Sequence, residues 1–142
     1  MIAPNEDRPM HIRELARAKV NLTLCVRGRR PDGYHDLESL VTFATIADEV
    51  AFRPGPDLSI ATTGPFAATI SGSNLAETAL RLLQGLGTGL RLGSVVLTKN
   101  LPVAAGLGGG SADAAAVLRA VRRANADLAG SIDWRNVAVR LG

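Results

Sequence analysis

A glycine-rich stretch between a strand-like run and an alanine-rich run constrains this chain more than any other feature. Between Pro102 and Ala114, four glycines occupy five positions, Gly106 and Gly108–Gly110. Glycine adopts positive φ without steric penalty, so consecutive peptide N–H groups can turn toward one anion. A helix that starts near Ser111 adds unpaired N–H groups and the positive end of its dipole. The stretch therefore predicts a phosphate-binding loop, with a plain glycine connection as the alternative.

Two familiar glycine signatures do not fit this stretch. A P-loop has a lysine directly after its last glycine, but Gly110 is followed by Ser111 and Ala112. A dinucleotide-binding turn, G-x-G-x-x-G, needs a glycine where Ser111 stands. Any phosphate held by this loop must therefore find its cation elsewhere in the chain.

The length and composition indicate one domain, or part of one. The chain has 142 residues, 46% of them hydrophobic, which is enough for a single core. Its lone cysteine, Cys25, cannot form an internal disulfide, and the charged first residues lack the apolar core of a secretion signal. Since no apolar run approaches the roughly 20 residues of a membrane span, we expect a cytoplasmic protein without a membrane partner.

The charge pattern does not favour nucleic-acid binding. The net charge is +3, the arginines are scattered, and aromatic residues make up only 4% of the chain, which leaves few rings for stacking on bases. A solvated basic surface is the preferred interpretation. Only two of the 16 basic residues, Lys19 and Lys99, are lysines. This scarcity suggests that both stand where a compact ammonium group is needed.

The first half of the chain has the pattern of β-structure. Residues 20–26 and 37–50 are expected to be strands that pair as a long hairpin, with Tyr34 and His35 in the turn-rich loop between them. Shorter strands are expected at 57–63 and 66–70.

The second half alternates helices and one strand. We expect a helix over about 74–85 with Ser73 or Asn74 as its cap, and a strand over 91–98 that brings Lys99 to the edge of the glycine loop. A helix should begin near Ser111 and end at 125–130, and a further amphipathic helix should begin near Ile132 with Ser131 or Asp133 as its cap. The side chains expected to face the core from the helix that begins near Ser111 are Ala114, Val117, Leu118 and Val121.

The glycine stretch resembles the phosphate-binding motif of the GHMP kinases. Two more motifs, 18–22 (Ala-Lys-Val-Asn-Leu) and 30–35 (Arg-Pro-Asp-Gly-Tyr-His), look like the member of that superfamily that phosphorylates a cytidyl-capped methylerythritol in isoprenoid synthesis. The resemblance runs from about Ala18 to Gly142. It implies an α+β fold of the ribosomal protein S5 domain 2 type over residues 1–142. It also implies an ATP site between this domain and a second, C-terminal domain.

The resemblance also implies roles for individual residues, with ATP as co-substrate and Mg²⁺ as cofactor. Lys19 would be the catalytic lysine near the acceptor hydroxyl, and Asn21 would contact the substrate. Tyr34 and His35 would hold the cytosine, while Asn74 and Lys99 would lie near the adenine. Ser111 would be available to phosphate or to Mg²⁺. The residues expected to wrap the triphosphate are Pro102, Val103, Ala104, Ala105, Gly106, Leu107, Gly108, Gly109, Gly110, Ser111 and Ala112.

One departure from the family pattern concerns the general base. In the family, a Leu-Gly pair is followed by a small residue and the catalytic aspartate, whereas this sequence stops at Leu141-Gly142. We therefore expect the aspartate and the C-terminal domain, the intramolecular partner of this one, to be missing, and the chain alone to be inactive or weakly binding. Two alternatives stay open: another small-molecule kinase of the superfamily, and a non-catalytic S5-like module that binds nucleotide or RNA.

Overall fold

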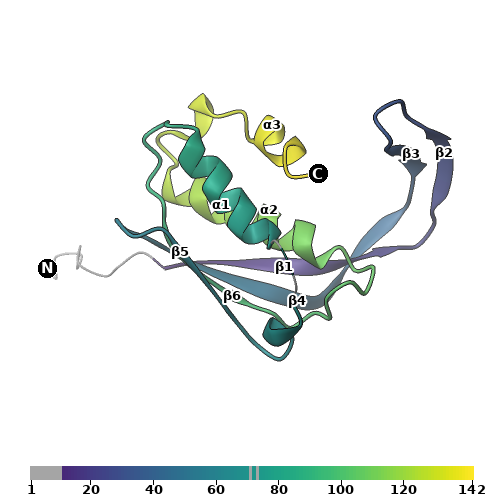
Figure 1. Cartoon of the computed structure of the whole chain (residues 1–142), viewed down its shortest axis with the longest axis horizontal. Helices are drawn as coiled ribbons and strands as arrows, with labels where there is room; N and C mark the ends of the chain where they lie inside the picture. Colours follow the sequence, from purple (N-terminus) through teal and green to yellow (C-terminus); the bar gives the residue numbers. More distant parts are fainter. Residues whose placement is uncertain (1–10, 71, 73) are drawn as a thin grey trace, which may run out of the picture.

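In the computed structural model, two helices lie over one face of a four-stranded sheet, and a hairpin extends from one end (Figure 1). The structure describes residues 11–70, 72 and 74–142. This arrangement confirms the expected α+β class. The strands are β1 (Ile12–Asn21), β2 (Cys25–Arg29), β3 (His35–Glu38), β4 (Val41–Pro54), β5 (Ser59–Thr63) and β6 (Gly93–Thr98). The helices are α1 (Leu75–Gly85), α2 (Gly109–Ala124) and α3 (Trp134–Val139), with short 3₁₀ turns η1 (Ala67–Thr69) and η2 (Ala129–Ser131).

The main sheet has the strand order β1-β4-β6-β5. Its pairs are antiparallel except β5 with β6, which α1 connects as a parallel crossover. Alternate residues of the central strands, Val50 and Phe52 on β4 and Val95 and Leu97 on β6, are fully buried in the core beneath the helices. The core therefore fixes α2 relative to β4 and β6. The glycine loop leaves the sheet at the end of β6.

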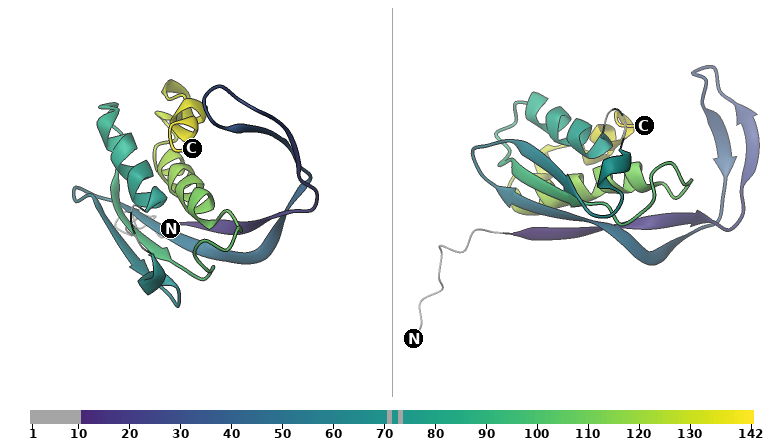
Figure 2. Two further views of the ribbon diagram at one scale, coloured as in Figure 1. Left: turned by 45° about the vertical axis from the view of Figure 1, so that its right-hand side comes forward. Right: turned by 60° about the horizontal axis from the view of Figure 1, so that its bottom comes forward.

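The expected long hairpin forms, but it is divided into two parts. β1 pairs with β4 as far as Asn21, whereas β2 pairs with β3 in a separate two-stranded sheet. The predicted strand over 20–26 is thus wrong in its bounds. Thr23 Oγ1 accepts the Leu40 N–H at 3.1 Å across 17 positions, so a side chain takes the place of a backbone acceptor where the strand ladder breaks. As a result, the β2–β3 hairpin projects beyond the main sheet and curves toward the side of the helices (Figures 1 and 2).

Both longer helices lie where the sequence places them. Asn74 caps α1, its Oδ1 accepting the Ala76 N–H at 2.9 Å; the alternative cap, Ser73, lies outside the described residues. α2 begins at Gly109, two residues before Ser111, with the left-handed Gly108 as its N-cap. The four residues predicted to face the core from α2 are confirmed as buried.

Two predictions near loops have different outcomes. The strand expected at 66–70 is wrong: the chain makes the 3₁₀ turn η1, because Gly64 at φ 95° starts a tight reversal and its carbonyl accepts the Ala67 N–H at 3.2 Å. The final helix is confirmed. Asp133 caps it through a 3.0 Å bond from the Asn136 N–H.

Candidate functional site

The loop from β6 to α2 turns through the left-handed region three times. The φ angle is 59° at Ala104, 72° at Gly106 and 67° at Gly108. A non-glycine residue held in this region is strained, and such strain persists only where the surrounding structure requires it. Because Gly108 offers no side-chain cap, the first N–H groups of α2 are not satisfied by a side chain at that position. The loop therefore has the backbone geometry for holding an anion.

A pocket of about 360 Å³ lies against this loop. It combines the loop itself with α1, the end of β6 and the first turn of α2. Its lining includes the predicted adenine residues Asn74 and Lys99 and the predicted phosphate residues 102–111, together with Ile70, Leu75 and Asp113. The structure thus brings together in one cavity most of the residues predicted to bind nucleotide.

Lys19 reaches the glycine loop because β1 contains a bulge. The pairing of β1 with β4 shifts register between Arg17 and Lys19, and a bulge re-aims the side chains around it. The Lys19 N–H donates to the Leu107 carbonyl oxygen at 2.8 Å. A Cβ atom added at Gly108 would lie 3.6 Å from both Cβ and Cε of Lys19. The lysine stem therefore runs along the loop backbone at Gly108.

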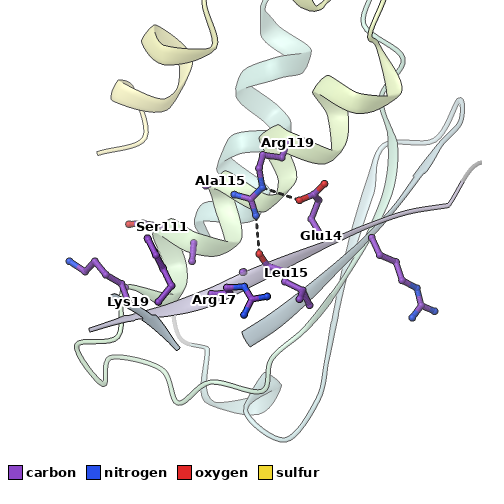
Figure 3. A pocket seen from close by; sticks show the side chains of 12 residues that line it. Glu14, Leu15, Arg17, Lys19, Ser111, Ala115 and Arg119 are labelled. Carbon is purple, nitrogen blue, oxygen red and sulfur yellow. Dashed lines mark hydrogen bonds and ion pairs between the residues drawn. The ribbon is translucent and has the colours of Figure 1, made fainter. Parts of the chain in front are cut away.

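A second, larger pocket of about 720 Å³ lies between β1 and α2, with Lys19 and Ser111 in its wall (Figure 3). Arg119 closes another part of this wall, donating to Glu14 at 2.9 Å and to the Leu15 carbonyl oxygen at 2.9 Å. Burial acts to raise the pKa of Glu14, but its bonds to Arg123 and Arg119 outweigh this and hold the pKa below its usual value. Glu14 is therefore a charged carboxylate that is held by Arg119 and Arg123. Lys19, which contacts the loop at Leu107 and Gly108, is the cation of this pocket nearest the loop.

Lys99 is buried beneath the loop and paired with two carboxylates. Its side chain is 4% exposed; Nζ donates to Asp113 Oδ2 at 2.7 Å and also to Asp48 Oδ2. Burial acts to lower the pKa of Lys99, but the bonds to both carboxylates raise it. Burial also raises the pKa of Asp113 to about 6, and Asp113 Oδ1 has no hydrogen-bond partner among the described residues. The ammonium is thus engaged with protein groups.

Sequence reasoning identified Lys99 but missed both of its partners. Asp113 stands alone in an alanine-rich helix, whereas Asp48 is followed by Glu49 in an otherwise apolar strand run. A lone carboxylate in an apolar stretch is a signal for a buried pair, because such groups are rarely buried without a partner. The sequence therefore indicated that such a carboxylate has a partner, but it did not indicate that the partner is Lys99.

The residues predicted to hold the acceptor lie away from the loop. Asn21 is the last residue of β1, and its Oδ1 accepts from Ser39 Oγ at 3.1 Å. Tyr34 and His35 are exposed on the β2–β3 hairpin, whose turn is tied by the Tyr34 N–H to Asp32 Oδ1 at 3.1 Å. The structure does not bring these two side chains to the glycine loop, so their roles stay predictions.

The described residues do not form a complete Mg²⁺ site. They contain no group of three or more acidic, histidine or cysteine residues that could hold a metal ion. At the loop, Ser111 offers a hydroxyl, but Asp48 and Asp113 are buried and bound to Lys99. Mg²⁺ is normally held by one or two carboxylates with substrate phosphates, and the expected Mg²⁺ stays a prediction. Within the same part of the chain, no helix has the length and apolar character to cross a membrane.

Comparison with known proteins gives a matching family and similar proteins of known name. Residues 74–142 match the family described as GHMP kinases N terminal domain. The chain is 58% identical over 116 residues to a 4-diphosphocytidyl-2-C-methyl-D-erythritol kinase from Bradyrhizobium sp. (strain BTAi1), covering 80% of this chain and 38% of that protein. It is 57% identical over 122 residues to the protein of the same name from Rhodopseudomonas palustris, covering 84% and 40%.

A solved structure gives the same result. The crystal structure of a 4-(cytidine 5'-diphospho)-2C-methyl-D-erythritol kinase aligns with a TM-score of 0.67 at 39% identity, over 92% of this chain and 46% of the other. The chain therefore spans about two fifths of the length of the curated relatives it matches. From the matched domain, the two relatives and the shared fold, we conclude that residues 74–142 carry the N-terminal domain of the GHMP kinases.

Proposed function

We propose that the protein transfers the γ-phosphoryl group of ATP to the 2-hydroxyl of 4-diphosphocytidyl-2-C-methyl-D-erythritol. This is a cytoplasmic step toward isoprenoid precursors by the non-mevalonate route. The observation that carries the proposal is the glycine loop, which forms a pocket with Asn74 and Lys99 on one side and contacts Lys19 on the other. The printed names of the similar proteins support the choice of acceptor.

In this proposal, the backbone of residues 102–112 holds the triphosphate. Its left-handed turns and the start of α2 direct N–H groups at the phosphate oxygens, on which charge must be stabilised during transfer. The adenine would lie toward Asn74 at the other end of the same pocket. Phosphoryl transfer needs mainly positioning and charge stabilisation, which such a rigid cradle supplies.

Lys19 would stabilise the charge on the transferred group. Its side chain lines the larger pocket beside Ser111, while its backbone is tied to Leu107. An ammonium at this position would lie between the triphosphate loop and the acceptor. Asn21, two residues further along β1, would orient the acceptor, and Tyr34 and His35 on the projecting hairpin would hold its cytosine by stacking and hydrogen bonds.

The described residues place no free carboxylate beside Lys19, so we propose that the general base comes from the part of the relatives beyond the matched region. That part, more than half of their length, would also close the cleft as an intramolecular partner domain. We derive no step through Mg²⁺, because the described residues hold no group of three or more acidic, histidine or cysteine residues that would mark its site.

The proposal is tested in a chimera in which this chain replaces the matching part of the Bradyrhizobium relative. ADP release should depend on 4-diphosphocytidyl-2-C-methyl-D-erythritol, and Lys19→Met should lower kcat by about a hundredfold or more if Lys19 stabilises the transition state. Arg135→Met, a basic residue of α3 outside both pockets, is the control. ADP release with homoserine or mevalonate but not with the cytidyl acceptor would refute the assignment.

A further inference from the structure

The entrance of the glycine loop is held by one buried carboxylate. Asp48, on β4, is fully buried, and its Oδ1 accepts the N–H groups of Asn100 at 2.6 Å and of Leu101 at 2.8 Å. These are the two residues by which the chain leaves Lys99 and enters the loop. A carboxylate that accepts two backbone N–H bonds fixes the direction of the peptide more tightly than a neutral acceptor does.

The exit of the loop is joined to the same carboxylate through Lys99. The Lys99 ammonium donates to Asp48 and to Asp113, which lies in the second turn of α2. A Cβ atom at Gly109, the first residue of α2, would lie 3.6 Å from Lys99 Nζ and 3.7 Å from Asp48 Oδ2. The backbone at the loop exit therefore rests directly on the ion cluster.

The backbone of Lys99 is itself fixed from the neighbouring strand. Its N–H donates to the Thr63 carbonyl oxygen at 2.8 Å, and its carbonyl accepts the Phe66 N–H at 3.2 Å. A Cβ atom at Gly64 would lie 2.6 Å from the Lys99 carbonyl oxygen, so no larger residue allows this approach. The ammonium is thus presented from a backbone that has little freedom to move.

We infer that Asp48, Lys99 and Asp113 are positioning residues, which hold the two ends of the glycine loop in the geometry that receives a triphosphate. The inference rests on the proposed function and assigns Lys99 a role through the loop backbone in place of a contact with adenine. The reason is that the Lys99 ammonium links Asp48, at the entrance of the loop, with Asp113, at its exit. A loop ordered in advance binds its ligand without the cost of ordering.

The first experiment compares Asp48→Asn with Asp127→Asn in the chimera with the Bradyrhizobium relative, which supplies the remainder of the proposed ATP cleft. The asparagine side chain would keep the shape of Asp48, but its amide cannot serve two backbone donors and a lysine together. Asp127 is a surface partner of Arg91, beyond the end of α2 that lies away from the loop, and controls for loss of an acid in an ion pair. ATP binding by calorimetry should weaken about tenfold or more in Asp48→Asn, as expected when a pre-ordered loop becomes mobile, and stay unchanged in Asp127→Asn.

If Asp48→Asn does not fold, hydrogen exchange of the wild-type chain tests the inference instead. In the wild-type chain without ATP, hydrogen exchange at the Asn100 and Leu101 amides should be as slow as in β6. Exchange there as fast as in an exposed turn would overturn the inference, as would a folded Asp48→Asn with wild-type ATP affinity. If the wild-type chimera binds no ATP while these amides are protected in the chain, the proposed function fails and the ordering of the loop stands.

Discussion

Replacing Lys99 by methionine should cost the domain much of its stability at neutral pH. The change leaves Asp48 and Asp113 buried without their shared cation; Asp48 keeps two backbone donors, whereas Asp113 keeps no partner among the described residues. Removing one partner of a buried ion pair costs about 3–5 kcal/mol. Since whole domains are stable by only about 5–15 kcal/mol, the variant should be close to unfolding.

The sign of the pH dependence follows from the carboxylates. Burial already raises the pKa of Asp113 to about 6, and loss of the lysine must raise the pKa further. A raised pKa in the folded state gives stability at low pH that is lost as pH rises through that pKa. Above about pH 6 the wild type has completed this loss, whereas Lys99→Met, with its higher Asp113 pKa, continues to lose stability. The difference in the free energy of unfolding between the two proteins should therefore grow there by up to about 1.4 kcal/mol per pH unit.

The assay is urea unfolding at pH 6 and pH 8, followed by far-UV circular dichroism and by the fluorescence of Trp134. Lys19→Met is the matched control, because this lysine is half-buried and makes no ion pair among residues 11–70, 72 and 74–142; it should change stability by at most about 0.5 kcal/mol. Adding Asp113→Asn to Lys99→Met should restore part of the loss. A deficit under about 1 kcal/mol at pH 8, or an equal deficit at both pH values, would refute the reasoning.

Three further outcomes are expected. In the chimera, His35→Ala should weaken binding of the cytidyl acceptor in calorimetry while ATP binding stays unchanged, and equal loss of both would contradict the cytosine role. Gly93→Ala should destabilise the chain in urea by about 1–3 kcal/mol or more, because its Cβ would overlap the Arg53 carbonyl oxygen, whereas Gly28→Ala meets nothing within 4 Å and should leave stability nearly unchanged. Asp113→Asn should remove the loss of stability that the wild type shows as pH rises through about 6; identical urea profiles from pH 4 to 7 would argue against a buried, titrating Asp113.

The parts of the fold that were predictable are those with local causes. Asn74 supplies a cap three residues before Glu77, and the alanine run after Ser111 has high helix propensity, so both helices could be placed within two residues. The glycine loop was predictable for the same reason, since positive φ at Gly106 and Gly108 depends on the residues themselves.

The errors in the bounds of the hairpin strands and in the site arose where distant contacts decide. The bounds of β1 depend on its pairing with β4, and the break after Asn21 depends on hydrogen bonds between Thr23 and Leu40. The site shows the same limit. Asp48 is 51 positions from Lys99 and Asp113 is 14 positions away, so no local pattern could join them. The local sequence indicated the loop and the family resemblance gave Lys19 its role, but neither indicated the cluster beneath them.

The scarcity of lysine can now be explained for one of its two positions. At Lys99 the cation must contact Asp48 and Asp113 at once in a space that the Gly109 backbone covers, with a Cβ there only 3.6 Å from Nζ. An ammonium is compact and donates in three directions, whereas a planar guanidinium is larger and fits a single carboxylate edge to edge. In a chain otherwise built with arginine, a lysine at this point is therefore required by the shape of the cluster, and Lys99→Arg should disturb the loop almost as much as Lys99→Met.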